Sequence, residues 1–152
     1  MPTDTADQTV EVNAPPDRVL AIIRDVESQV VWVPEILEAE VREWYDDGTP
    51  ATAWFKASAP VGTDEYTLAY THRPDGMDWT LVEGRLQTGQ DGRYQLEPLG
   101  ADRTTVTFEL RISHHLPLPG FVRRKVISGL VSNTVTGLQG FVDAGDAEDD
   151  EG

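Results

Sequence analysis

Apolar and polar side chains alternate through the middle of the chain, and this period-two pattern predicts a series of β-strands. The clearest strand covers residues 103–113, where Val106, Phe108 and Leu110 alternate with polar residues. Asp-Gly pairs between two pairs of these segments are typical hairpin turns. Short turns between consecutive strands favour an antiparallel meander. The remaining strands are predicted at residues 9–13, 37–44, 51–58, 63–72, 77–83 and 84–98.

Apolar residues at helical spacing predict two short helices near the N-terminus and one long helix at the C-terminus. The first follows Pro15-Pro16, because a proline at the start of a helix lacks only a donor that would be unpaired there, and it ends near Asp25. Residues 27–33 predict a second short helix or turn, which Pro34 stops. The long helix covers residues 120–143. Its apolar stripe consists of Ile127, Leu130, Val131, Thr134, Leu138 and Phe141.

The order of these elements predicts an α+β fold in a single domain over residues 8–144. About seven strands would form one curved antiparallel sheet wrapped around the long C-terminal helix, with two short helices after the first strand. A chain of 152 residues suits a single core of this kind. Residues 1–7 and 145–152 are polar and acidic, and we expect them to be flexible termini.

The net charge narrows the classes of partner. The formal charge is −15, so the chain repels phosphate backbones and nucleic-acid binding is not expected. There is no cysteine, which excludes disulfides and thiolate chemistry and favours a reducing location. The polar N-terminus does not read as a signal peptide, and no apolar run is long enough to span a bilayer. A cytoplasmic location is therefore expected.

Three glycines interrupt the predicted long helix, at Gly129, Gly137 and Gly140. A glycine inside a helix costs about 0.8–1 kcal/mol relative to alanine. We expect each of them either to touch the sheet backbone or to border empty space that is kept clear for a ligand.

Several titratable residues are candidates for acid–base chemistry. His72 is a candidate base, with Tyr70 or Arg85 nearby to stabilise an enolate. Asp64 and His72 lie near strand ends, where side chains are usually solvated, so no catalytic residue is assigned. The full set is Glu43, Asp64, His72, Glu83 and Arg85.

Two clusters near the C-terminus do not change this picture. His114 and His115 are adjacent strand residues, which point to opposite faces, so they do not predict a metal site. No nucleotide-binding or zinc-hydrolase motif is present, and no cofactor or metal is predicted. Arg123-Arg124-Lys125 begins the long helix and is expected on its solvated face. The alternatives are a transient contact with anionic lipid headgroups and a contact with the acidic C-terminal tail.

Three sequence segments and the proline-led final helix resemble the START-like superfamily of polyketide cyclases and lipid-transfer proteins. The resemblance covers residues 8–143, and within the superfamily it is strongest to small bacterial cyclase/dehydrase-type proteins related to coenzyme-Q-binding proteins. One departure is that a Tyr-Pro pair found before the tryptophan in many relatives is replaced by Gln29 and Val30, with a proline at Pro34. The segments are V-E-V-N-A-P-P-D-R-V-L-A-I-I-R-D-V-E, W-V-P-E-I-L-E-A-E-V and T-T-V-T-F-E-L.

The resemblance implies a helix-grip fold with a cavity between the sheet and the final helix that holds a lipid, a quinone or an aromatic polyketide. Strand residues that share a face, and the stripe of the long helix, are then the candidate lining. These residues are Phe55, Tyr66, Leu68, Tyr70, Trp79, Leu81, Phe108, Leu110, Ile127, Leu130, Val131, Thr134 and Leu138.

The leading hypothesis is a protein that binds or transports a hydrophobic small molecule, because this function needs only a cavity. A polyketide cyclase or dehydratase is the second, and it needs at least two polar groups that converge inside the cavity. A protein-interaction module is the third. The sequence assigns neither the ligand nor the oligomeric state.

Overall fold

Seven strands form one antiparallel sheet in the order β1-β7-β6-β5-β4-β3-β2. The structure is a computed structural model that describes residues 3–151, with side chains described for residues 3–145. Consecutive strands are neighbours in the sheet, except that β1 pairs with β7. The elements are β1 (Thr3–Val12), α1 (Pro16–Arg24), the 3₁₀ turn η1 (Val26–Ser28), α2 (Gln29–Trp32), β2 (Ile36–Trp44), β3 (Pro50–Ala59), β4 (Gly62–Arg73), β5 (Gly76–Gly84), β6 (Gln87–Pro98), β7 (Thr104–His114) and α3 (Gly120–Glu151).

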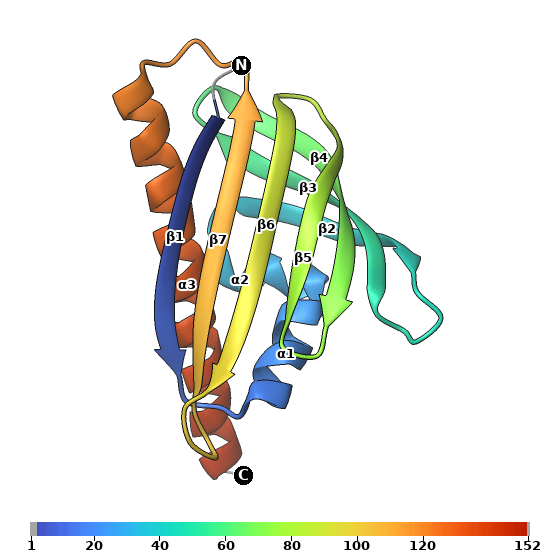
Figure 1. Ribbon diagram of the computed structural model, residues 1–152, viewed down its shortest axis with the longest axis vertical. Coiled ribbons are helices and arrows are strands. Elements are labelled where there is room, and N and C mark those ends of the chain that lie inside the picture. Colours follow the sequence, from blue (N-terminus) through green and yellow to red (C-terminus); the bar gives the residue numbers. More distant parts are fainter. Residues whose placement is uncertain (1–2, 152) are drawn as a thin grey trace.

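The sheet is curved, and α3 lies behind β1 and β7 rather than across the middle of the sheet (Figure 1). Strands β2 and β3 run nearly crosswise to β1 and β7. Register shifts interrupt the β2–β3, β4–β5 and β6–β7 ladders, and such irregularities bend strands. The most extensive contacts of α3 are with β1, and those with β7 and α2 are smaller. The concave face of β3 to β6 therefore has no extensive contact with the helix.

The predicted fold class is confirmed, with a curved seven-stranded antiparallel sheet, a long C-terminal helix and short helices after the first strand. The predicted start of the first strand is wrong, because β1 begins at Thr3 and residues 3–7 pair with β7. Residues 3–7 lack an alternation of apolar side chains because the side chain buried in this part of β1 is a carboxylate, that of Asp4. Asp4 forms an ion pair of 3.0 Å with Arg123 of α3. Residues 1–2 lie outside the described residues.

The long helix also differs from its predicted end. It continues past Ala144 to Glu151, so residues 145–151 extend α3 instead of forming a separate flexible tail. Each residue added to an existing helix gains one backbone hydrogen bond, which favours continuation once the helix has formed. Residue 152 lies outside the described residues.

Gly137 is the point where α3 approaches another backbone most closely. A Cβ atom at this position would lie well under 3.0 Å from the carbonyl oxygen of Trp32, which ends α2. The prediction for this glycine is therefore wrong, because Gly137 touches the backbone of α2 and neither touches the sheet nor borders empty space. A Cβ at Gly129 or Gly140 would meet nothing within 4 Å.

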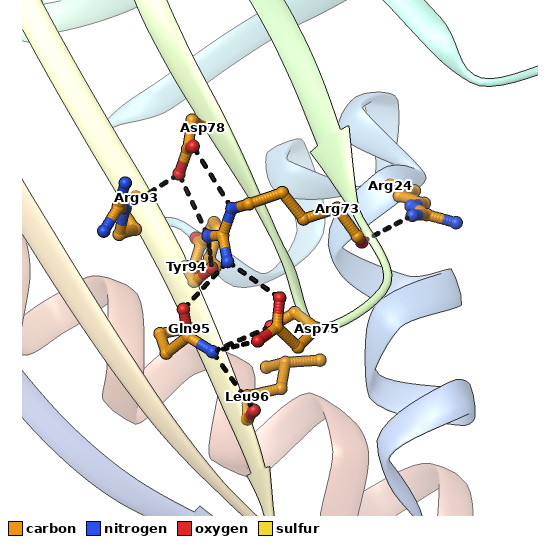
Figure 2. A network of polar contacts seen from close by, with 8 residues as sticks. All are labelled: Arg24, Arg73, Asp75, Asp78, Arg93, Tyr94, Gln95 and Leu96. Atoms are coloured by element: carbon orange, nitrogen blue, oxygen red, sulfur yellow. Dashed lines mark hydrogen bonds and ion pairs between the residues drawn. The ribbon is translucent and has the colours of Figure 1, made fainter.

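A polar network ties the β4–β5 turn to β6 and α1 (Figure 2). The Arg73 guanidinium donates to both carboxylate oxygens of Asp78, at 3.2 and 3.0 Å, and to the Tyr94 carbonyl at 3.0 Å. The Arg73 carbonyl accepts a bond of 3.0 Å from Arg24 of α1. Partial burial alone would raise the pKa of Asp78, but hydrogen bonds from Arg73 and Arg93 lower it below its ordinary value. This network joins three elements at the end of the sheet where β4 turns into β5.

Replacing Gly137 by alanine is expected to destabilise the protein by about 1–3 kcal/mol, because the new methyl group overpacks against the Trp32 carbonyl. Gly140→Ala is the matched control on the same helix, and its open surroundings should make it more stable by about 0.5–1 kcal/mol through helix propensity. Chemical denaturation of the two variants measures both changes. Equal stabilisation by the two substitutions would contradict the close approach.

Candidate functional site

A cavity of about 760 Å³ lies between α3 and the concave face of the sheet. Its volume is within the range of about 300–1,000 Å³ that is typical of small-molecule sites. The walls come from β3, β4, β5, β6 and β7 on one side and from the first half of α3 on the other. Exposed wall residues mark its opening, between the β3–β4 turn at Pro60 and the α3 residues Phe121, Val126 and Gly129. Gly129 thus borders open space, whereas Gly140 is simply exposed.

Most of the predicted lining residues lie on this wall. The side chains of β3 to β7 supply an apolar surface that is broken by tyrosine and tryptophan. Their role in binding a ligand stays a prediction. The predicted residues on the wall are Phe55, Tyr66, Leu68, Tyr70, Trp79, Phe108, Leu110, Leu130 and Thr134.

Four predicted residues, Leu81, Ile127, Val131 and Leu138, do not line the cavity. The last three are buried in the core with Val135, so α3 carries two adjacent stripes, and only the neighbouring stripe with Leu130 and Thr134 faces the cavity. Sequence periodicity merged the two stripes, because they differ by only one position along the helix. Leu81 lies just past Thr80, where the pairing of β5 with β6 ends.

Aromatic rings form the inner part of the wall. Trp79 lies 5.8 Å from Phe108 and 5.3 Å from Tyr94 between ring centroids, and the Tyr94 and Phe108 rings stack at 4.9 Å. The indole of Trp79 lies directly over Gly92 of β6, where any Cβ would clash with the ring. The absence of a side chain at Gly92 therefore sets the position of Trp79.

A row of hydrogen bonds runs along the same wall. Trp79 Nε1 donates to Gln90 Oε1 at 2.9 Å, and Gln90 Nε2 donates to Gln87 Oε1 at 2.6 Å. Gln87 Nε2 in turn donates to Asp64 Oδ2 at 3.1 Å, and the backbone N–H of Leu86 donates to Asp64 Oδ1 at 2.8 Å. We call Trp79, Gln90, Gln87 and Asp64 the polar row; all four line the cavity.

Sequence reasoning predicted Trp79 on the wall and named Asp64 as a titratable candidate, but it missed both glutamines of this row. Asp64 was expected to be solvated, but it is 4% exposed and lines the cavity. Gln87 and Gln90 lie in a segment whose glycines obscure strand periodicity, and the register shift between Gln87 and Gly89 is not visible in the sequence. Gln29, which stands where many relatives carry Tyr-Pro, also lines the cavity.

Three tyrosines bring hydroxyl groups to the cavity wall. Burial raises the pKa of Tyr66, Tyr70 and Tyr94 above the ordinary value, and the carboxylates of Asp64 and Glu35 raise that of Tyr66 further. These phenols are neutral at physiological pH, and each can donate a hydrogen bond to a bound molecule.

One charged residue of α3, Arg123, is placed differently from expectation. Arg123 is largely buried and lines the cavity, since its guanidinium pairs with Asp4 at 3.0 Å and donates to the Leu118 carbonyl at 3.0 Å. Arg124 and Lys125 are exposed, as predicted for the basic cluster. Desolvation lowers the pKa of His114, another wall residue, and its Nδ1 accepts a bond from the Leu116 N–H at 3.1 Å.

The other predicted titratable residues are not part of the cavity wall. His72 Nε2 donates to the Pro50 carbonyl at 2.7 Å, and its ring packs beside Tyr45 and Tyr70. Glu43 and Glu83 are exposed, and Arg85 donates to the Thr63 carbonyl. Of the two candidate partners of His72, Tyr70 packs beside it and Arg85 donates to the Thr63 carbonyl, and the role of His72 as a base stays a hypothesis.

Within residues 3–145, no group of three or more histidine and acidic side chains is arranged to hold a metal ion. Nor does any helix in the described part of the chain combine the length and the hydropathy that crossing a membrane requires.

The family described as "Polyketide cyclase / dehydrase and lipid transport" matches residues 12–139. A START superfamily protein from Mycobacterium smegmatis is similar in structure, with a TM-score of 0.85, 26% identity and coverage of 92% of this chain and 97% of that one. A search of curated proteins by sequence finds no match.

Two more distant structures share the fold. An aromatase/cyclase from a Streptomyces species, Zhui, has a TM-score of 0.76 at 17% identity, with 92% of this chain and 93% of that chain covered. A STAR-related lipid transfer protein from Xanthomonas axonopodis has a TM-score of 0.72 at 18% identity, with 91% and 85% covered.

Gly92→Ala is expected to displace the Trp79 ring and to break its bond to Gln90, because the methyl group would occupy the space of the indole. The expected results are a changed near-ultraviolet circular dichroism spectrum and a loss of about 1–3 kcal/mol in stability. Gly89→Ala in the same strand is the control, since its Cβ would make only an ordinary contact of 3.5 Å with Ser113. An unchanged spectrum for Gly92→Ala would contradict the placement of Trp79.

Proposed function

The chain belongs to the polyketide cyclase/dehydrase and lipid transport family, and we propose that it binds a hydrophobic small molecule in the cavity between its sheet and α3. The observation that carries this proposal is the cavity itself, about 760 Å³ in volume and walled mainly by aromatic and aliphatic side chains. A core that only stabilised the fold would be close-packed, with few voids larger than a water molecule. Space of this size lowers the stability of the empty protein, so a bound ligand is its most direct explanation.

The position of the opening supports exchange of the ligand with the surroundings. Phe121 is 69% exposed and Val126 42% exposed, and both lie at the rim of the cavity beside Lys125. An apolar rim with an adjacent cation suits brief contact with an anionic lipid surface. We include transient membrane contact in the proposal, and sedimentation with anionic vesicles tests it, since absence of binding would remove this part.

An enzyme of the cyclase or dehydratase type is the second candidate. The specific observation in its favour is that two carboxylates, Asp64 and Glu35, and the neutral phenol of Tyr66 lie on one cavity wall. A carboxylate and a phenol are a base and a donor of the kind that enolate chemistry needs. The relatives described as aromatase/cyclases share the fold with this chain, and that likeness alone assigns no reaction.

The chain is proposed to act as a single domain in the cytoplasm, without nucleic acid, because it lacks cysteine and carries a formal charge of −15. A protein-interaction role has no specific feature of the cavity in its favour.

Filling the cavity tests the binding proposal. Ala57→Trp adds an indole at a buried wall position of β3 and is expected to lower the affinity for a neutral hydrophobic dye such as Nile red by about tenfold or more, because the added volume excludes the dye. Val82→Trp adds the same side chain at a position that is 59% exposed and outside the cavity, and it should bind the dye as the unmodified protein does.

Native mass spectrometry of the unmodified protein with the hydrophobic molecule that it carries separates a carrier from a dehydrating enzyme. A carrier releases its ligand with unchanged mass, whereas a dehydratase, or a cyclase whose ring closure is followed by dehydration, releases a product that has lost water. Equal dye binding by both tryptophan variants would place the dye outside the cavity and contradict the proposed function.

A further inference from the structure

The hydrogen bonds of the polar row all run in one direction. An indole N–H can only donate, so Gln90 must turn its oxygen toward Trp79. Gln90 then turns its nitrogen toward Gln87, which must present its oxygen to accept that bond. Gln87 therefore places its own nitrogen toward Asp64, whose Oδ2 accepts. The side-chain amides therefore cannot flip without leaving two donors or two acceptors face to face.

This fixed direction leaves a defined set of unused groups on the cavity wall. The amide nitrogens of Gln87 and Gln90 each use one of two hydrogens within the row, which leaves one N–H apiece. Each oxygen of Asp64 accepts one bond and has a further lone pair. The wall thus offers N–H donors from Gln90 and Gln87 and a carboxylate acceptor at the Asp64 end. Gln87 Nε2 and Asp64 Oδ2 are 3.1 Å apart, so a donor and an acceptor lie side by side there.

The charges at this wall select against an anionic ligand. Neither Asp64 nor Glu35 has an ion-pair partner among the described residues, and Glu35 Oε2 is buried without any hydrogen-bond partner. Of the cations on the wall, Arg123 is already paired with Asp4 and Lys125 is exposed to solvent. The field that an incoming group meets at the polar row is therefore negative.

We propose that the polar row binds the hydroxyl group of a neutral hydrophobic molecule, an alcohol or a phenol, at Gln87 and Asp64. The hydroxyl hydrogen donates to Asp64, and the hydroxyl oxygen accepts the remaining N–H of Gln87. The row then prefers the hydroxylated ligand to a hydrocarbon of the same shape and to the corresponding carboxylate. This inference rests on the proposed binding function and narrows its ligand class.

Three small aromatic molecules of similar size separate these cases: 2-naphthol, naphthalene and 2-naphthoate. At pH 7 a phenol is neutral and a carboxylic acid is ionised. Equilibrium dialysis should show 2-naphthol binding about tenfold or more tightly than either of the others, because a hydrogen bond to a buried charged acceptor has that effect on an equilibrium constant. An apolar cavity without the row would instead favour naphthalene, since its transfer from water is the more favourable.

Asp64→Asn tests the acceptor. The affinity for 2-naphthol should fall about tenfold while that for naphthalene stays within about twofold, because hydrogen bonds to an ionised acceptor are roughly twice as strong as those to a neutral one. Asp91→Asn is the matched control, since it removes the same charge from an exposed position of β6 outside the cavity, and it should leave both affinities unchanged. Gln87→Met is a second test that does not depend on the folding of the Asp64 variant, and it should lower only the affinity for 2-naphthol.

The outcomes separate this inference from the function on which it rests. Equal or weaker binding of 2-naphthol compared with naphthalene overturns the hydroxyl site and leaves the binding function standing. Tighter binding of 2-naphthoate overturns it as well and assigns recognition to Arg123 and Lys125 instead. Failure of all three molecules to bind overturns both proposals.

Discussion

The seating of α3 on the edge of the sheet is the constraint on which the rest of the structure depends. The helix packs along β1, its start is tied to that strand by the ion pair between Arg123 and Asp4, and farther along Gly137 lies against the carbonyl of Trp32. These contacts lie on the β1 and α2 side of the helix. A sheet that curves away from such a helix leaves a space between them, and side chains of the sheet line that space. The cavity is therefore a consequence of where the helix is held.

Polar groups inside this space are costly unless they are hydrogen-bonded, and the polar row meets this requirement with few bonds. The polar row satisfies a buried carboxylate with one backbone N–H and one amide, without any cation. Most of the remaining wall is aromatic or aliphatic, and its three tyrosines are held neutral by burial. The result is a cavity with a mainly apolar lining and few charged groups. The direction of the hydrogen bonds distinguishes one end of its wall from the other.

The sequence predicted the architecture well, because period-two and helical patterns report burial directly. Strand β7 is an example, since Val106, Phe108 and Leu110 alternate without interruption and are all buried. Prediction failed where burial involves polar residues or depends on register. Asp4 and Asp64 read as solvated carboxylates because their partners lie 119 and 23 residues away in the chain. Gln90 has no local signal at all, since its function in the wall depends on the register of β5 against β6, which places Trp79 over Gly92.

The two stripes of α3 have a consequence for how such a protein can change over time. Val131 and Val135 hold the helix in the core, whereas Leu130 and Thr134, one position earlier in each case, face the cavity. A substitution in the second stripe alters the shape of the site while leaving the core contacts in place. Stability and ligand choice are thereby assigned to different faces of one helix, so that lineages with this arrangement can diversify what they bind without first compensating for damage to the fold.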